Sequence, residues 1–374
     1  MIPPGSRNLF QERDMASPAI ARARYQGLAA ARRWEHEPAR PKEKFTLSVG
    51  DRVGELTVIG HVACGRMTEL YQVWSNRHWC ALTGKILLPE HCVNGVAPVS
   101  FRREAEVLDK LKHPNIVRLF GSGEADGRAF ILLEYLAGPS LFDVLEGLTQ
   151  RRLQVPDAIR AIMHVGAAIH YLHRCGYLYR DLKPGNVHLR EGVPVLLDFD
   201  VVREIEPIRR PADRLGTAPY MAPEQVMKQP LTAATDVYGL GALLYECVTG
   251  KWPTEEPEDE DDEAFWDELD EDEETDERPV ARVRPPTEGR ELTTKELEQR
   301  YPQITQAPVP PRAHNPGVPR DLEKLILRCL AADPADRFQT VSGMLAALAP
   351  MLKGRHRMWP ENAPIERRAD TATR

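Results

Sequence analysis

The order of two hydrophobic patterns along the chain limits its fold more than any other feature. Residues 55–88 hold short apolar stretches rich in Val, Ile, Leu, Tyr and Trp, which predict three antiparallel strands. A helical stripe at 101–111 follows, and further strands are expected at 117–122 and 129–135. Beyond Gly138 the apolar residues recur mainly at helical spacing. Strands followed by helices indicate an α+β protein of two lobes with a cleft between them.

The helices expected in the second lobe have recognisable boundaries. Ser140 is expected to cap the first of them, with Asp143 in the capping-box position. Further helical patterns span 157–173, 236–249, 321–330 and 341–352.

One buried charge is expected in the helix of the first lobe. Phe101, Ala105 and Leu108 form an apolar stripe at the helical period, and Glu104 lies inside that stripe. A carboxylate buried alone costs several kcal/mol. Glu104 therefore requires a cation or hydrogen-bond donors elsewhere in the chain.

Charge is distributed unevenly. The 374 residues include 49 Lys and Arg and 56 Asp and Glu, which gives a net charge of −7. Residues 254–277 hold 17 acidic residues among 24 and no Lys or Arg, so the rest of the chain carries +10. The acidic run continues into Pro-rich sequence, and residues 254–316 are predicted to be an insertion. The run is either a solvated spacer or a site that attracts a basic partner. In the second case Phe265, Trp266 and Leu269 would form a small apolar face on it.

The remaining boundaries follow from composition. Residues 1–48 are expected to form a basic arm, with a helix from Ser17 to Trp34 and a Pro-containing linker. The arm is expected to act as a solvated extension, or else as a docking or membrane-surface arm. The arm is one candidate partner for the acidic run. The segments predicted beyond it are a first lobe at 49–136, a second lobe at 137–352 and a tail at 353–374.

Several classes of protein are disfavoured. The six cysteines lack the paired spacing of a zinc site, so reduced thiols are expected. No apolar run reaches the roughly 18 residues of a membrane span, and the N-terminus lacks the apolar region of a signal peptide. We expect a cytoplasmic protein without a membrane span. No reading helix or stacking platform for nucleic acid is evident.

The most informative residues are Tyr-Arg-Asp-Leu-Lys-Pro-Gly-Asn at 179–186, followed after eleven intervening residues by Asp-Phe-Asp at 198–200. This stretch resembles the signature of the eukaryotic-type (Hanks-type) protein kinases, in particular the bacterial Ser/Thr kinases. The resemblance covers residues 53–352 apart from the insertion. It implies the two-lobed protein kinase fold, with an antiparallel sheet and one helix in the N-lobe and a mainly helical C-lobe. It also implies transfer of the γ-phosphoryl group of ATP, with Mg²⁺ as the metal.

The resemblance assigns roles to the polar residues of this stretch. Asp181 matches the catalytic base, and Lys183 matches the lysine that steadies the γ-phosphate. Asn186 and Asp198 match the two metal ligands, which are hard oxygen donors suited to Mg²⁺. Upstream, Lys85 matches the strand lysine that holds the α- and β-phosphates. Glu104 matches its helical partner, which explains the buried carboxylate.

A nucleotide site is implied between the lobes. Beside Lys85, its expected lining residues are Val62, Gly65, Leu70, Thr83, Leu133, Glu134, Leu136 and His188, with Leu133 as gatekeeper. The family's glycine-rich loop is degenerate, because Ala63 and Thr68 replace two of its glycines. Weaker or altered ATP binding is therefore expected. Asp200 also replaces the glycine of Asp-Phe-Gly, which restricts the backbone and adds negative charge near the metal ligands.

The acceptor and the regulation are also addressed by motifs. Asp-Leu-Lys-Pro and Thr217 are typical of Ser/Thr kinases, so a protein substrate with a Ser or Thr hydroxyl is expected. No Ser, Thr or Tyr occurs from Asp198 to Gly216. Asp213 or Glu206 is hypothesised to supply fixed negative charge there in place of a phosphate.

Scaffold pairs complete the resemblance. Glu224 and Arg337 match a buried ion pair of the family, Asp236 matches the aspartate that braces the catalytic loop, and Tyr179 is expected to pack on Phe199. The function implied is a Ser/Thr protein kinase. The alternative is a weakly active or inactive pseudokinase that acts as a binding or scaffold module.

Overall fold

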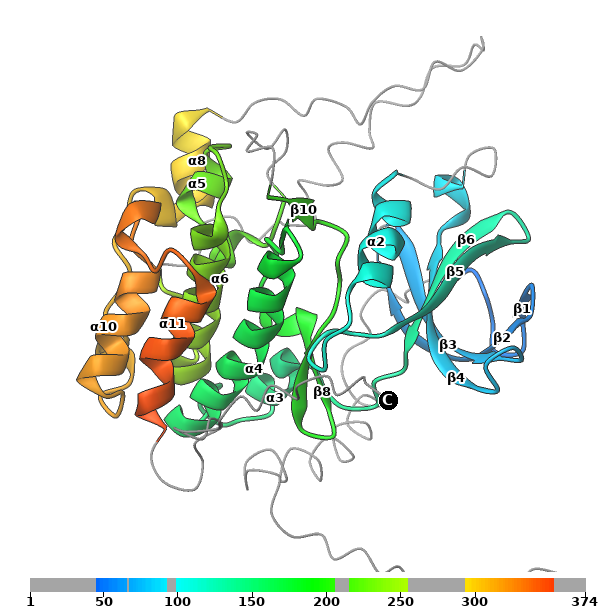
Figure 1. Ribbon diagram of the computed structural model, residues 1–374, viewed down its shortest axis with the longest axis horizontal. Helices are drawn as coiled ribbons and strands as arrows, with labels where there is room; N and C mark the ends of the chain where they lie inside the picture. Colours follow the sequence, from blue (N-terminus) through cyan, green and yellow to red (C-terminus); the bar gives the residue numbers. More distant parts are fainter. Residues whose placement is uncertain (1–44, 66, 93–98, 206–214, 255–292, 353–374) are drawn as a thin grey trace, which may run out of the picture.

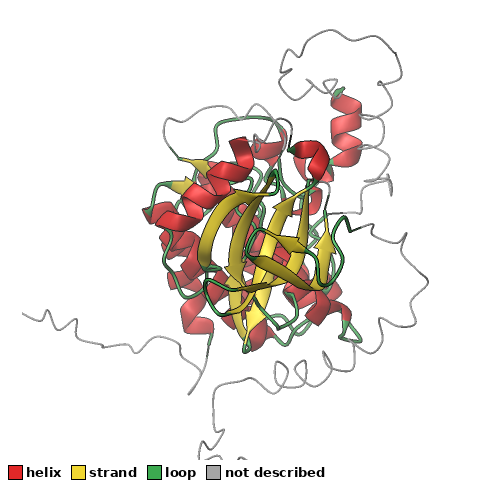
Figure 2. Cartoon of the chain, turned by 90° about the vertical axis from the view of Figure 1, so that its right-hand side faces the viewer, coloured by secondary structure: helices red, strands yellow, loops and turns green. Residues whose placement is uncertain are grey.

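The computed structural model describes residues 45–65, 67–92, 99–205, 215–254 and 293–352. Figure 1 shows two lobes: a sheet with helix α2 in one, and most of the helices in the other. In Figure 2 the sheet faces the viewer and the helices lie behind it. The predicted α+β fold of two lobes is confirmed. The helix expected from Ser17 lies outside the described residues.

The N-lobe is built on one antiparallel sheet in the order β1-β2-β3-β4-β6-β5. Its strands are β1 (Arg52–Val53), β2 (Leu56–Cys64), β3 (Thr68–Ser75), β4 (Cys80–Leu87), β5 (Leu119–Ala125) and β6 (Arg128–Glu134). Tyr71, Val73 and Leu82 come from one face and join a buried apolar cluster. Alternate residues of β3 and β4 are only half-buried. This alternation leaves one sheet face free to line a cleft.

Helix α2 (Val99–Lys110) packs beside the sheet. Its buried residues include Phe101, Leu108 and the predicted exception, Glu104, which is 1 % exposed. The helix therefore carries a carboxylate into the interior at the border between the lobes.

The C-lobe is arranged around α6 (Ala233–Thr249), in which every residue after Ala233 is buried. Thr232 caps this helix and Gly250 ends it with a left-handed φ of 72°. The other helices are α3 (Leu141–Glu146), α4 (Val155–Arg174), α5 (Pro223–Val226), α8 (Thr294–Arg300), α9 (Pro311–His314), α10 (Arg320–Cys329) and α11 (Val341–Leu348). Ser140 and Asp143 form the predicted capping box of α3.

Short elements connect these helices to the cleft. They are the strands β7 (Tyr177–Leu178), β8 (Val187–Arg190), β9 (Val193–Leu196) and β10 (Arg203–Glu204) and the 3-10 helices η1 (Pro89–His91), η3 (Pro184–Asn186), η4 (Ala218–Tyr220), η5 (Pro302–Ile304), η6 (Pro334–Asp336) and η7 (Ala349–Met351). Strand β7 pairs with β10, and β8 pairs with β9.

Part of the predicted insertion is regular structure. Residues 293–316 contain α8, η5 and α9, and Leu297 and Tyr301 pack in a small cluster with Met221 and Val226. The acidic run lies mostly outside the described residues. The chain before it is tied to the chain after it, because Val309 N donates to Pro253 O at 2.8 Å.

The loop between α2 and β5 joins the lobes through Asn115. The Asn115 side chain donates to Pro194 O at 2.8 Å and lies 3.2 Å from His164 Nδ1. The Asn115 backbone N–H donates to His113 Nδ1 at 3.1 Å. Both imidazoles therefore act as acceptors at the lobe junction.

These histidines predict a loss of stability in acid. Burial lowers the pKa of His113 and of His164, for which the neighbouring His113 adds to the effect. An unfolded histidine takes up a proton near pH 6.5. Below that pH the unfolded chain binds more protons than the folded chain, so the free energy of unfolding falls. We expect a lower melting temperature at pH 5.5 than at pH 7.5, and a smaller difference for His164→Gln. His170→Gln on the same helix controls for the loss of a histidine, and an identical response of His164→Gln and wild type would contradict the assignment.

Candidate active site

Asp236 of α6 holds the loop at 179–186, which is predicted to be the catalytic loop. This buried carboxylate accepts hydrogen bonds from the backbone N–H groups of Tyr179 and Arg180 at 2.9 and 2.8 Å, and lies 2.7 Å from His173 Nε2. Arg180 has a φ of 76°, a conformation that a non-glycine residue rarely adopts. These hydrogen bonds match the bracing role predicted for Asp236. They stabilise the strained backbone conformation of Arg180.

Asp181 lies at the centre of a polar network. It is 7 % exposed, and its Oδ2 lies 3.0 Å from Lys183 Nζ and accepts from Asn186 Nδ2 at 2.9 Å. Thr217 Oγ1 donates to Asp181 Oδ1 at 2.8 Å and accepts from Lys183 Nζ at 2.9 Å. The carboxylate is thus oriented from three sides, while Lys183 holds positive charge beside it.

A second network joins the lobes. Lys85 Nζ lies 2.9 Å from Glu104 Oε2, 3.0 Å from Glu104 Oε1 and 3.1 Å from Asp198 Oδ1. The predicted partner of the buried glutamate is therefore present. The additional contact with Asp198 was not predicted.

The protonation of this network follows from burial and charge. Desolvation opposes a charge on Lys85, but the Glu104 and Asp198 carboxylates raise its pKa above the ordinary value. Burial, together with the charge of Asp198, raises the pKa of Glu104, although the Lys85 ammonium group within 3.0 Å of both its oxygens acts in the opposite direction. Burial acts in the same direction on Asp198, where the charge and hydrogen bond of Lys85 hold the pKa below its usual range. The three groups form an ionic cluster.

The Asp-Phe-Asp residues show where the backbone is strained. Asp198 has a φ of 54°, whereas Asp200 is not among the residues with positive φ. Asp200 therefore adopts a φ that is available to any L-residue. Phe199 is buried and packs on the Tyr179 ring at 5.5 Å and 75°, as predicted. Burial and the Asp198 carboxylate raise the pKa of Asp200 to about 6. Above that pH, Asp200 adds a negative charge where glycine would have none.

The predicted nucleotide-lining residues come from both lobes. Val62 lies in β2, Gly65 between β2 and β3, Leu70 in β3, Thr83 and Lys85 in β4, Leu133 and Glu134 at the end of β6, Leu136 in the connection to the C-lobe and His188 in β8. Leu70 is directly opposite Lys85, and Thr83 is opposite Leu133. Leu70, Thr83 and Lys85 are half-buried on the sheet face opposite the apolar cluster. Gly65 closes the β2–β3 turn by donating its N–H to Thr68 O at 2.8 Å.

Two features of the nucleotide-lining residues were not predicted. The Glu134 side chain forms an ion pair with Arg190 and accepts from Arg118 N at 2.9 Å, and Arg190 also donates to Pro114 O at 2.8 Å. Burial lowers the pKa of His188 against the opposing charge of Asp143. No local pattern in the sequence indicates Arg190, because its partners lie 56 and 76 positions away.

The predicted metal ligands, Asn186 and Asp198, have side-chain oxygens that can contact a divalent cation. Asn186 donates its amide nitrogen to Asp181 O and Oδ2, both at 2.9 Å, so its oxygen remains an acceptor. The Asp198 side chain is 36 % exposed, and Lys85 contacts its Oδ1. An amide and a carboxylate oxygen are hard donors that suit Mg²⁺. These residues fit a divalent cation bound together with phosphates.

The fold and this geometry agree with comparisons to known proteins. Residues 55–347 match the family described as the protein kinase domain. The chain belongs to the protein kinase family. It is 30 % identical over 309 residues to the serine/threonine-protein kinase PknB of Mycobacterium tuberculosis (strain ATCC 25618 / H37Rv), which covers 80 % of this chain and 42 % of the relative. A probable serine/threonine-protein kinase PknB of Bifidobacterium longum (strain NCC 2705) is 26 % identical over 307 residues, covering 78 % and 38 %.

Solved structures support the same fold. The crystal structure of the Mycobacterium tuberculosis PknI kinase domain aligns with a TM-score of 0.54 at 24 % identity, covering 81 % of this chain and 98 % of that chain. The protein kinase chain described here spans less than half the length of the curated relatives named above. Within its described residues, no helix has the length and apolar character needed to span a bilayer.

Proposed function

We propose that this protein kinase family member is an active Ser/Thr protein kinase. The observation that carries the proposal is that two polar networks lie close together. Asp181, Lys183 and Thr217 form one, and Lys85, Glu104 and Asp198 form the other. The charge of Lys183 acts on Asp198 and so links the two networks. Phosphoryl transfer depends on positioning and on neutralising phosphate charge rather than on covalent chemistry by the protein. Both requirements have named residues here. Transfer of labelled phosphate from ATP to a protein hydroxyl tests the proposal.

The proposed reaction assigns Asp181 to the acceptor. The hydroxyl oxygen of a substrate Ser or Thr forms a bond to the γ-phosphorus while the bond to the β,γ-bridging oxygen breaks and ADP leaves. The hydroxyl proton passes to Asp181 Oδ1 or Oδ2, and Lys183 balances the negative charge on the transferring group. Because Thr217 contacts both residues, it positions this pair.

The nucleotide is proposed to bind across the lobes. Lys85, held by Glu104, would contact the α- and β-phosphates, and Asn186 and Asp198 would hold the divalent cation. A bound Mg²⁺ would supply positive charge that neutralises the phosphates. Backbone groups at Glu134 and Leu136 would bind the adenine edge, with Leu133 as gatekeeper.

The pseudokinase alternative is favoured by two observations. Ala63 and Thr68 add side chains to the phosphate-covering loop, and Asp200 places a third carboxylate near Asp198 and Glu104. These changes are proposed to weaken ATP binding. A scaffold without transfer activity would bind nucleotide and leave acceptor proteins unlabelled.

The charge of the acidic run, residues 254–277, bears on which protein substrates the kinase binds. The described residues on either side of residues 255–292 belong to the C-lobe: Val309 N donates to Pro253 O, and Leu297 and Tyr301 pack with Met221. We propose that the 17 acidic residues of 254–277 attract basic protein substrates or the chain's own basic arm. The solvated spacer is the competing interpretation.

Neutralising the run should weaken binding of basic substrates. With each Asp and Glu of 255–277 replaced by Asn and Gln, we expect the KM for a basic protein acceptor to rise about 10-fold at low salt, because long-range attraction is lost. The KM of the variant should also lose most of its salt dependence. Steady-state kinetics at two salt concentrations measure both effects, and a neutral peptide acceptor serves as the control. Unchanged KM and salt dependence would favour the spacer.

Localisation stays a prediction. Cys80, Cys92, Cys175, Cys247 and Cys329 are reduced thiols, the state that the predicted cytoplasmic environment maintains.

A further inference from the structure

The activation segment, here residues 198–221, begins with a stretch that phosphorylation of its own side chains cannot order. No Ser, Thr or Tyr occurs from Asp198 to Gly216, so ordinary phosphorylation cannot order this stretch. The hypothesised substitutes, Glu206 and Asp213, lie outside the described residues. Yet the turn that follows holds Thr217 against Asp181. Another part of the chain must therefore fix the position of this turn.

Gln303 makes the relevant contact. It lies in η5 and is 5 % exposed, and its Nε2 donates to Ala218 O at 2.7 Å and to Met221 O at 3.1 Å. These carbonyls belong to the start of η4 and to the residue after it. One side-chain amide thus bridges both ends of the turn that follows Thr217.

Apolar packing accompanies the two hydrogen bonds. Leu297 of α8 and Tyr301 are buried against Met221 and Val226, with Ile304 beside them. All three packing residues on this side come from the chain after the acidic run. They bring η5 close enough for Gln303 to reach the turn.

The opposite side of the turn is held by other residues. Tyr220 OH donates to Glu246 Oε2 at 2.6 Å, and Trp252 Nε1 donates to Tyr220 OH at 3.3 Å. These contacts fix the Tyr220 side chain to α6. Gln303 is the side chain that donates to both backbone carbonyls, and Ala218 O also accepts from Met221 N at 3.3 Å.

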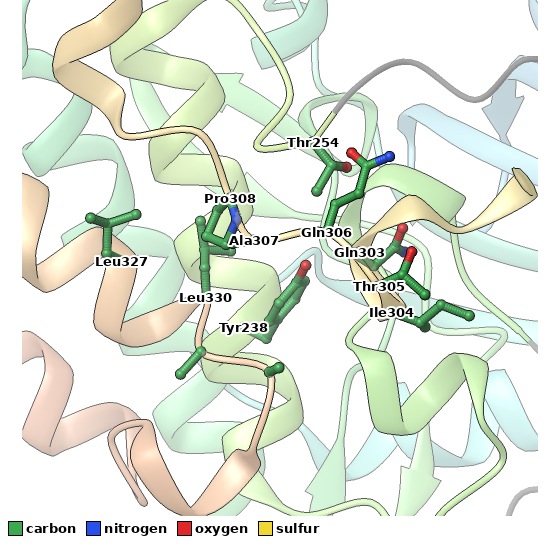
Figure 3. Close-up of a pocket in the computed structure, with 12 residues that line it drawn as sticks. Tyr238, Thr254, Gln303, Ile304, Thr305, Gln306, Ala307, Pro308, Leu327 and Leu330 are labelled. Atoms are coloured by element: carbon green, nitrogen blue, oxygen red, sulfur yellow. The ribbon is translucent and has the colours of Figure 1, made fainter. Parts of the chain in front are cut away.

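A cavity borders η5 and limits the apolar packing that can hold this 3-10 helix in place. Figure 3 shows Gln303, Gln306 and Tyr238 around this cavity, whose volume is about 310 Å³. Apolar contacts with the Met221 cluster hold η5 on one side, whereas the cavity borders it on the other. The Gln303 donors add the directional contact to Ala218 and Met221 that this packing does not supply.

We infer that Gln303 is a positioning residue for the protein substrate. It holds the turn 217–221 in the conformation that presents Thr217 to Asp181 and Lys183, and so takes the place of a phosphate in ordering this part of the activation segment. The inference rests on the proposed kinase function. It assigns to the chain after the acidic run a direct effect on acceptor binding, separate from nucleotide binding.

The test replaces the donors without changing the volume. Gln303→Met retains the length of the side chain but lacks both N–H groups. We expect the KM for a protein acceptor to rise about 10-fold, the effect of one to two hydrogen bonds. The KM for ATP and the rate of ATP hydrolysis by water should change by less than about twofold. Phosphatase treatment should leave the wild-type KM values unchanged.

Gln306→Met is the matched control, because Gln306 is an exposed glutamine three residues further on. It should retain the wild-type KM values. Equal KM values for the two variants, or a parallel rise in the KM for ATP, would overturn the inference. If the wild type transfers no phosphate, the proposed function fails, and hydrogen exchange then decides the inference separately. Amides of 217–221 should exchange faster in Gln303→Met than in Gln306→Met, and equal exchange would refute the role of Gln303.

Discussion

Asp181→Asn should lower kcat for phosphorylation of a protein acceptor by about 10²–10⁴-fold, the range expected for a lost general base. The asparagine keeps the size of the side chain, and its oxygen can still accept from Thr217. It cannot take the hydroxyl proton, and it removes the negative charge beside Lys183. Among the proposed nucleotide and metal residues Asp181 contacts Asn186 but neither Lys85 nor Glu104, so the KM for ATP should change much less than kcat. Steady-state phosphorylation kinetics measure both parameters.

The control for this substitution is Asp109→Asn, at an exposed position on α2. It should retain the wild-type kcat. A kcat for Asp181→Asn within about twofold of wild type would show that Asp181 is not the base.

Arg337→Met should lower the free energy of unfolding by about 3–5 kcal/mol, as removal of one partner from a buried ion pair does. Arg337 is 1 % exposed and donates to both carboxylate oxygens of Glu224 at 2.8 Å. It also donates to the carbonyl oxygens of Ala331, Ala332 and Ala234. The methionine would leave Glu224 buried without a cation, so the midpoint of urea unfolding should fall.

Two further variants make this prediction specific. Arg320→Met replaces an exposed arginine and should change the unfolding free energy by less than about 0.5 kcal/mol. Adding Glu224→Gln to Arg337→Met should recover part of the loss, because the unpaired charge is removed. Equal midpoints for Arg337→Met and Arg320→Met would show that the pair does not stabilise the fold.

Contacts that leave a mark in local sequence were predictable. Glu104 interrupts an apolar stripe, and a buried carboxylate needs a cation, so its requirement for a partner followed from one helix. The capping box of Ser140 and Asp143 also follows from residues three positions apart. The kinase motifs then identified Lys85 as the partner, and the structure places the two side chains in contact.

Contacts between distant polar residues outside the kinase motifs were not predictable. Gln303 reaches carbonyl groups 85 and 82 positions away, and any residue can supply a backbone carbonyl. Arg190 and Glu134 are similarly separated and belong to different lobes. Helix α8 was missed because Leu297 and Tyr301 give too little periodicity, and its burial depends on Met221 and Val226.

Labelling with γ-³²P-ATP tests the central claim most directly. We predict that the wild-type protein with Mg²⁺ labels a basic protein acceptor on Ser or Thr, and that Asp198→Asn, which alters a proposed metal ligand, does not. Asp109→Asn should label the acceptor as the wild type does. A wild-type protein that binds ATP but labels the acceptor no more than Asp198→Asn would contradict the claim and identify the chain as a pseudokinase.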